Sequence, residues 1–155
     1  ANFQPLWAYA DEYVVDLTLP FISEETARWM YPIKSIIDAG GRIAFGSDWS
    51  VSSVNPMPQI ETALTRVDAE SHATEVLNPE QRITIEQAVE AFTMGTAYVN
   101  HQEDVTGSIE VGKLADLVVL NQNIFEIVPE QISETRVLLT LFEGKPVYGN
   151  PGRAL

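Results

Sequence analysis

Residues 40–51, which read GGRIAFGSDWSV, are the stretch that most constrains the fold of this chain. Ile43, Ala44 and Phe45 form an unbroken apolar run between turn-forming residues. This pattern is typical of a strand buried on both faces in a parallel α/β sheet. At the carboxyl end of such a strand the chain opens into the crevice where ligands bind in these folds. Asp48 follows that end and is therefore a candidate catalytic residue.

A second interpretation of Asp48 stays open at this point. Its side chain could cap a turn, with Gly46 and Ser47 supplying the bend. In that case the carboxylate has a structural role and takes no part in chemistry. This stretch alone does not decide between the two interpretations.

The residues before this strand predict one βαβ unit. Residues 1–4 read as the tail of a strand that Pro5 ends, and an irregular aromatic-rich loop follows it. Ser23 is a typical N-cap, and the helical pattern after it runs to Gly40 with a break or kink at Pro32. Strand, loop, broken helix and strand then make up the unit.

Two helices are predicted after Asp48. The first opens at Pro58, because proline suits the first turn of a helix. Its expected inward-facing residues are Ile60, Ala63, Leu64 and Val67. The second begins at Thr84 and Gln87, which have the spacing of a capping box, and Gly95 is expected to interrupt it. The expected apolar face of this second helix consists of Ile85, Ala88, Val89 and Phe92.

Beyond Asn100 the chain changes from helical to β-rich. The stretches TGSIEVGKLADLVVLN and VLLTLFEGKPVYG have the composition of strands and are punctuated by glycine. Glu143, Gly144 and Lys145 predict a tight turn between two antiparallel strands. A helical α/β part therefore gives way to a small β unit.

The charge balance excludes several classes of partner. The 155 residues carry 22 acidic and 9 basic side chains, a net charge of -13. Such a surface repels phosphate backbones, so we expect no nucleic-acid partner and no binding to a membrane surface. No apolar run is long enough to cross a bilayer. The chain has no cysteine, which excludes disulfides and cysteine-type zinc sites and fits a cytoplasmic protein.

Other candidate sites lack the patterns that their chemistry requires. His72 falls in a polar stretch and His101 just after a predicted helix, and neither has another histidine at i+2 or i+4. We expect both at the surface rather than at a metal, because a metal site needs several converging ligands. The GSD sequence lacks the G-x-S-x-G spacing of a serine nucleophile, and no phosphate-binding G-x-x-x-x-G-K-[ST] loop occurs. Asp48 remains.

Several stretches, taken in order, resemble a known family. AFGSDWSV, TIEQAVEAFTMGTAYVN, TGSIEVGKLADLVVLNQNIFEI and VLLTLFEGKPVYGN follow one another along most of the chain. Together they resemble the C-terminal part of a metal-dependent amidohydrolase of the amidohydrolase 3 group. FQPLW near the start resembles the strand that precedes the GSDW strand in that group, and Arg28 falls where the group often has an arginine.

The resemblance implies an α/β fold and a role for Asp48. Residues 1–103 correspond to the C-terminal part of a (β/α)8 TIM-type barrel, and residues 104–155 to the C-terminal share of a small β-sandwich. In that family the aspartate after the eighth strand is a ligand of a divalent metal, for which zinc is expected. It also serves as base toward water and then as proton donor to the leaving amine. Asp48 matches this position, and Trp49 and Gln4, at the same rim, are expected to line the substrate pocket.

The chain departs from the family pattern in its histidines. The family carries an H-x-H pair after the first strand, a bridging acidic or lysine ligand, and single histidines after the fifth and sixth strands, and this chain has none of them. A complete barrel needs about 250 residues, and one carboxylate cannot hold a zinc ion. We therefore expect a portion of an enzyme that hydrolyses non-peptide C–N bonds of a small molecule. That portion should be inactive alone and should associate with the missing N-terminal part of the barrel or with a second copy.

A second function class remains open from the residues. The missing metal ligands also suit a free-standing, noncatalytic α/β module, derived from the same scaffold, that binds a partner or oligomerises. Such a module would be monodisperse and would melt cooperatively, whereas a portion of a barrel would aggregate or oligomerise.

Overall fold

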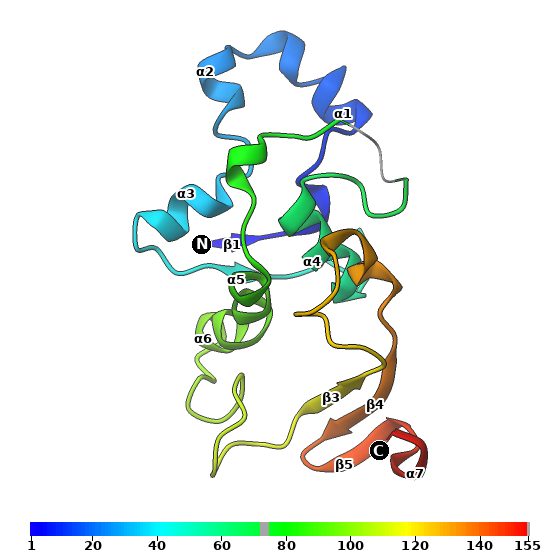
Figure 1. Cartoon of the computed structure of the whole chain (residues 1–155). Helices are drawn as coiled ribbons and strands as arrows, with labels where there is room; N and C mark the ends of the chain where they lie inside the picture. The colour runs from blue at the N-terminus through cyan, green and yellow to red at the C-terminus, as the bar shows by residue number, and fades with distance from the viewer. Residues whose placement is uncertain (72–74, 155) are drawn as a thin grey trace.

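The computed structural model describes residues 1–71 and 75–154 (Figure 1). In chain order its strands are β1 (Asn2–Phe3), β2 (Ala44–Phe45), β3 (Leu117–Leu120), β4 (Val137–Phe142) and β5 (Lys145–Gly149). Its α-helices are α1 (Glu12–Val15), α2 (Glu24–Ala27), α3 (Ile33–Asp38), α4 (Pro56–Thr65), α5 (Ile85–Glu90), α6 (Thr96–Val99) and α7 (Pro151–Ala154). Short 3-10 helices are η1 (Pro5–Trp7), η2 (Leu19–Phe21), η3 (Pro79–Gln81) and η5 (Pro129–Glu134), and η4 (Ala91–Gly95) is a π-helix. None of the described helices is both long and apolar enough to cross a membrane.

The predicted βαβ unit is confirmed in the middle of the molecule. Strands β1 and β2 pair in parallel, with Asn2 opposite Ala44 and Phe3 opposite Phe45. The Gly46 amide donates to the Phe3 carbonyl at 3.0 Å and continues the ladder beyond β2. Both strands are short, and the apolar run of the second is buried on both faces as its composition predicts.

The segment between these strands is more ordered than the sequence indicates. The aromatic-rich stretch that was expected to be irregular contains η1, α1 and η2, and Asp11 caps α1 by accepting from the Val14 amide at 2.7 Å. The break expected at Pro32 is present, because α2 ends at Ala27 and α3 begins at Ile33. In Figure 1, α1 and α2 form a lobe at the top of the view, away from the paired strands.

Helix α4 differs from its prediction at both ends. It starts at Pro56 rather than Pro58, because the Asn55 side chain caps it by accepting from the Met57 amide at 3.1 Å. It ends at Thr65 because Arg66 adopts a left-handed conformation, so Val67 lies outside the helix and not on its inward face. The helix is covered on more than one side, since polar residues are buried along with the apolar ones. These buried polar residues of α4 are Gln59, Glu61, Thr62 and Thr65.

The predicted second helix is confirmed at its start and differs at Gly95. Thr84 and Gln87 form the reciprocal hydrogen bonds of a capping box at the start of α5. Gly95 does not interrupt the helix, because η4 joins α5 to α6 as one wider, π-helical turn. The glycine instead allows close packing: a Cβ atom there would lie 2.3 Å from the Ile43 carbonyl oxygen.

The C-terminal part forms a separate three-stranded antiparallel sheet in the order β3-β4-β5. The predicted turn joins β4 to β5, and its residues Glu143 and Gly144 both have positive φ angles, of 48° and 75°. This is the backbone that a tight two-residue hairpin requires. The predicted β-rich texture is thereby confirmed.

The two parts share one hydrophobic core. Apolar side chains from the strands and helices of the first part pack together with Ile132 of η5, while Leu120 and Ile127 pack against the edge of this cluster. The buried carboxylate of Glu61 accepts a hydrogen bond from the Ser133 amide at 2.8 Å. The segment between β3 and β4 therefore returns to α4 and anchors the β unit there.

Candidate functional site

The parallel pairing of β1 and β2 brings two predicted site residues to one edge. Gln4 directly follows β1, and Asp48 comes three residues after the end of β2. Because carboxyl ends of parallel strands meet at the same edge of a sheet, both residues lie at the edge where ligands bind in α/β folds. Gln4 is half-buried, and its backbone carbonyl accepts from the Trp7 amide at 3.2 Å.

Asp48 occupies an unusual position in the turn after β2. Its φ angle is 50°, in the left-handed region that aspartate tolerates better than most residues. Two serines close this turn. The Ser47 hydroxyl accepts from the Trp49 amide at 3.2 Å, and the Ser52 hydroxyl donates to the Ser47 carbonyl. The Asp48 carbonyl accepts from the Val51 amide at 2.7 Å.

The Asp48 carboxylate is exposed and takes no part in holding this turn. Within the described residues it receives no hydrogen bond, so the turn-capping interpretation does not describe this geometry. Ser47 and Ser52 serve that structural purpose instead. The carboxylate is left available at the sheet edge.

The loop that follows presents apolar side chains beside Asp48. Trp49 is 72% exposed, Val51 74% and Val54 68%. Buried Gln59 holds the end of the loop, since its side-chain amide donates to the carbonyls of Ser53 and Asn55, each at 3.1 Å. Trp49, which was predicted to line the substrate pocket, thus lies on the surface next to Asp48. Its loop is held at its far end by Gln59 of α4.

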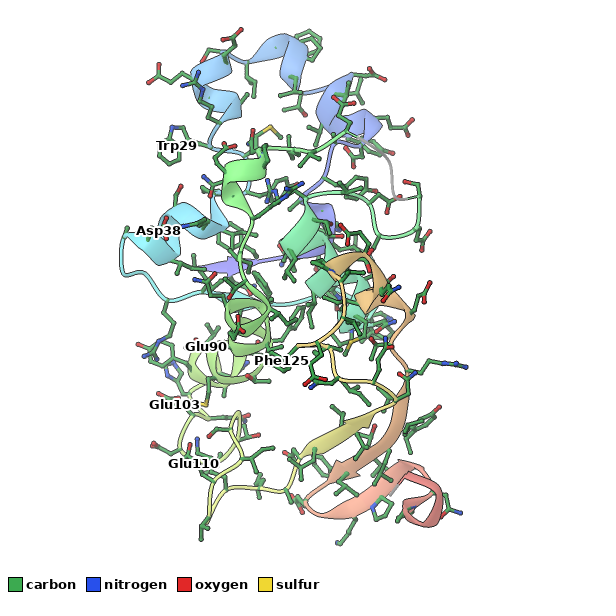
Figure 2. The ribbon with its side chains drawn as sticks, viewed as in Figure 1. Trp29, Asp38, Glu90, Glu103, Glu110 and Phe125 are labelled. Carbon is green, nitrogen blue, oxygen red and sulfur yellow. The ribbon has the colours of Figure 1, made fainter. Side chains whose placement is uncertain are left out.

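The acidic side chains do not gather into a metal site. Over residues 1–71 and 75–154, no three histidine, cysteine, aspartate or glutamate side chains lie close enough to hold a metal ion together. Figure 2 shows Asp38, Glu90, Glu103 and Glu110 spread along one side of the molecule. His101 is exposed as expected, and His72 lies outside the described residues. These residues alone therefore do not fit a metal ion, and Asp48 can be at most one ligand among others.

One buried charged residue lacks any sequence signal. Arg66 is fully buried and donates to three backbone carbonyls: Leu77 at 2.9 Å, Tyr31 at 3.2 Å and Met30 at 3.2 Å. Burial lowers the pKa of Arg66 to about 10. Arg66 thereby ties the junction between α2 and α3 to the segment that follows α4.

Comparison with known proteins identifies the family of this chain. The profile of the amidohydrolase family matches residues 1–148. The chain belongs to the amidohydrolase family. Similar solved structures have the amidohydrolase fold of the TIM-barrel superfamily, which agrees with the α/β class predicted from the sequence.

Individual relatives cover most of this chain. The N-substituted formamide deformylase of Arthrobacter pascens is 30% identical over 123 residues, which are 79% of this chain and 22% of that protein. The protein LONG AFTER FAR-RED 3 of Arabidopsis thaliana is 33% identical over 127 residues, 81% of this chain and 21% of that protein. A metal-dependent hydrolase of Pyrococcus furiosus has a solved structure that is similar with a TM-score of 0.56 and 26% identity. That similarity covers 72% of this chain and 21% of the hydrolase.

The chain spans about a fifth of the length of these proteins, 21% to 22% in each case. Membership of the amidohydrolase family thus rests on nearly the full length of this chain, not on one motif.

Proposed function

We propose that this chain is the C-terminal portion of a metal-dependent amidohydrolase. In this proposal β1 and β2 are the last two strands of a (β/α)8 barrel made in part by residues 1–103. Residues 104–155 are the C-terminal share of a β-sandwich. The shared core around Ile132 and the hydrogen bond from Ser133 to Glu61 support two parts that fold against each other.

The proposed reaction is hydrolysis of a C–N bond in an amide or cyclic amide that is not a peptide. The name of the Arthrobacter relative, a deformylase of N-substituted formamides, supports this bond type. The observation that carries the proposal is the exposed Asp48 carboxylate at the carboxyl end of β2, beside the end of the parallel strand β1. The Asp48 carboxylate accepts no hydrogen bond from the described residues.

Asp48 acts in this proposal as the acid and base of the reaction. Its carboxylate accepts a proton from the attacking water and later donates that proton to the leaving amine. A divalent metal, for which we propose zinc, lowers the pKa of water toward neutrality when it is bound. Asp48 is one ligand of that metal, and the remaining ligands come from outside the described residues.

The small-molecule substrate binds in this proposal at the rim formed by the loops after β1 and β2. Trp49 supplies an exposed indole next to Asp48, and Gln4 supplies a side-chain amide from the neighbouring strand end. Because Trp49 directly follows Asp48 in the chain, its apolar ring lies next to the carboxylate that is proposed to react.

The first experiment is to sequence the DNA upstream of the Ala1 codon and to express the complete reading frame. The proposal expects an H-x-H pair and two later single histidines upstream. It also expects Asp48→Asn to lower kcat by about 10²-fold or more, because the base is lost while the side-chain volume is kept. Asp38→Asn is the matched control. Asp38 is an exposed carboxylate paired with Lys34 at 2.6 Å, so its loss should leave kcat unchanged.

The opposite result supports the noncatalytic module. If the upstream frame encodes no such histidines, or if Asp48→Asn retains full turnover, the catalytic proposal fails. A start codon directly before Ala1, with a monodisperse and cooperatively melting product, would favour a free-standing binding or oligomerisation unit.

A further inference from the structure

One helical turn packs against β2, the strand that precedes Asp48. Phe92 and Gly95 belong to the π-helical turn η4, and Thr96 is the first residue of α6. All three contact β2 or the residue before it. The Phe92 and Phe45 rings meet edge to face, with their centroids 5.2 Å apart and an angle of 67° between the ring planes.

Gly95 determines how closely the helix backbone approaches the backbone of β2. A Cβ atom at this position would lie 2.3 Å from the Ile43 carbonyl oxygen and 3.3 Å from the Ala44 Cα. Only glycine lets the helix backbone rest on the strand backbone. The π-helical turn η4 contains this residue, and π-helical turns within α-helices are frequent at functional sites.

Thr96 fixes the end of the strand by a hydrogen bond. Its hydroxyl lies 3.0 Å from the Phe45 carbonyl oxygen and 3.0 Å from the Ala91 carbonyl oxygen, within its own helix. A hydroxyl has one proton, so the two carbonyls share a single donor. The Phe45 carbonyl belongs to the last residue of β2, three residues before Asp48.

The other neighbour of this strand end comes from β1. The Gly46 amide donates to the Phe3 carbonyl at 3.0 Å, on the β1 side of the strand. Since backbone groups of successive residues in a strand point to opposite sides, the Phe45 carbonyl points away from β1. Thr96 therefore satisfies a carbonyl that β1 does not reach.

We propose that Thr96 is a positioning residue for Asp48. Its hydroxyl holds the carboxyl end of β2 in the one placement from which the Asp48 carboxylate reaches the substrate. This inference rests on the proposed function of Asp48 and extends it to a residue 48 positions further along the chain. Asp48 makes no hydrogen bond of its own within the described residues, so its place depends on the strand and turn behind it.

Small displacements at such a strand end have large kinetic effects. A misplacement of about 1 Å in a reacting group can lower a rate about 10²-fold. Thr96→Val replaces the hydroxyl by a methyl group of similar size and should lower kcat about tenfold, since the strand is loosened rather than removed. KM should stay within about twofold, because the proposal gives Thr96 no contact with the substrate and the displaced Asp48 carboxylate acts in the chemical step.

The experiment compares four variants in the enzyme expressed from its complete reading frame. Thr96→Val and Thr96→Ala remove the hydroxyl, Thr96→Ser keeps it, and Thr93→Val is the matched control. Thr93 lies on the same helix, but its hydroxyl donates to the Val89 carbonyl at 2.7 Å and not to β2. Turnover is expressed per folded molecule, with the folded fraction taken from near-UV circular dichroism.

The proposal expects Thr96→Val and Thr96→Ala to lower kcat, and Thr96→Ser and Thr93→Val to keep it within about twofold. Hydrogen–deuterium exchange of the peptide that spans residues 43–52 should speed up in Thr96→Val and stay unchanged in Thr93→Val. If Thr96→Val fails to fold, the difference in kcat between Thr96→Ala and Thr96→Ser tests the role of the hydroxyl.

Two results overturn the inference. One is an unchanged kcat in Thr96→Ala, and the other is a loss in Thr96→Ser as large as that in Thr96→Ala. Asp48→Asn is measured in parallel. An inactive Asp48→Asn beside a fully active Thr96→Ala rejects the positioning role alone, whereas an active Asp48→Asn rejects the proposed function itself.

Discussion

Arg66 shows how a single residue can organise distant segments without any carboxylate partner among its hydrogen bonds. Its guanidinium donates to carbonyls of Met30, Tyr31 and Leu77, and the Tyr31 ring lies 5.8 Å from its central carbon. Carbonyl oxygens carry a partial negative charge, so hydrogen bonds to them favour the charged guanidinium. Burial opposes the charge and lowers the pKa of Arg66 to about 10. The arginine still remains charged at neutral pH.

Replacing this arginine should destabilise the fold. Arg66→Met in the full-length protein keeps most of the volume but removes three hydrogen bonds of a buried cation and leaves the Leu77 carbonyl without its donor, so we expect a loss of about 3 kcal/mol in the free energy of unfolding. Urea unfolding followed by tryptophan fluorescence measures it. Arg82→Met is the control: Arg82 is exposed and makes one side-chain hydrogen bond, to the Thr65 carbonyl at 2.9 Å. Equal losses in the two variants would contradict the role assigned to Arg66.

The sequence predicts Asp48 as a site residue but cannot predict Arg66. Asp48 is recognisable because a buried apolar run ends just before it, which is a local pattern. Arg66 lies near the end of a predicted helix with no pattern that marks it as buried, and its acceptor Tyr31 is 35 residues away. Which carbonyls surround a side chain is a tertiary property, and no local pattern carries it.

At the scale of elements, caps were predictable and close packing was not. Ser23 and the pair Thr84 and Gln87 mark helix starts through hydrogen bonds within a few residues, and Pro32 marks a break because proline has no N–H to donate; all three boundaries are confirmed. Gly95 was expected to interrupt a helix because glycine lowers helix propensity by about 1 kcal/mol. The structure shows an uninterrupted helix that uses this glycine to approach β2, which is a tertiary contact.

This packing makes Gly95→Ala a sensitive test of the contact between helix and strand. In an isolated helix the change would stabilise by about 1 kcal/mol. Here the new Cβ would meet the Ile43 carbonyl oxygen at 2.3 Å, so the helix and β2 must separate. We expect a net loss of about 1–3 kcal/mol in the free energy of unfolding, as in overpacked cores. Urea unfolding of the full-length protein gives the value.

Gly46→Ala is the control for this substitution. Gly46 lies at the end of the same strand, and its φ angle is outside the left-handed region. The nearest atom to a Cβ there is Asn2 Oδ1, at 4.0 Å. This variant should be unchanged or stabilised by up to about 1 kcal/mol, because alanine restricts the unfolded chain. A Gly95→Ala protein that is as stable as Gly46→Ala would show that the helix does not rest on the strand.

At the scale of the whole molecule, the fold leaves strand edges and apolar side chains uncovered. Within the described residues β1 and β2 pair only with each other, whereas every strand of a closed barrel has two neighbours. Phe21 is 80% exposed and Trp29 61%, and Figure 2 shows Trp29 pointing away from the ribbon. The sequence resemblance predicts the family and the open architecture together. It does not predict that Ile132 of η5, between β3 and β4, would complete the core around β1 and β2.

The open strand edges and the acidic charge have opposite effects on the self-association of residues 1–155 expressed alone. Unpaired edges and exposed apolar side chains favour association. A net charge of -13 at pH 7 opposes it through repulsion. We therefore expect oligomers at neutral pH whose mean mass grows when salt screens the charge, and grows further as the pH falls toward the sequence pI of about 4.3. Light scattering coupled to size-exclusion chromatography, at a series of salt concentrations and pH values, measures this.

The control for this experiment supplies the rest of the proposed barrel. Co-expression with the upstream part of the reading frame should cover the edges of β1 and β2, so the mixture should elute as one complex of defined mass that salt does not enlarge. A monodisperse monomer of residues 1–155 at all salt concentrations, with a single cooperative melting transition, would contradict the barrel proposal. In that case β1 and β2 need no further strands, and the free-standing module becomes the better account of this chain.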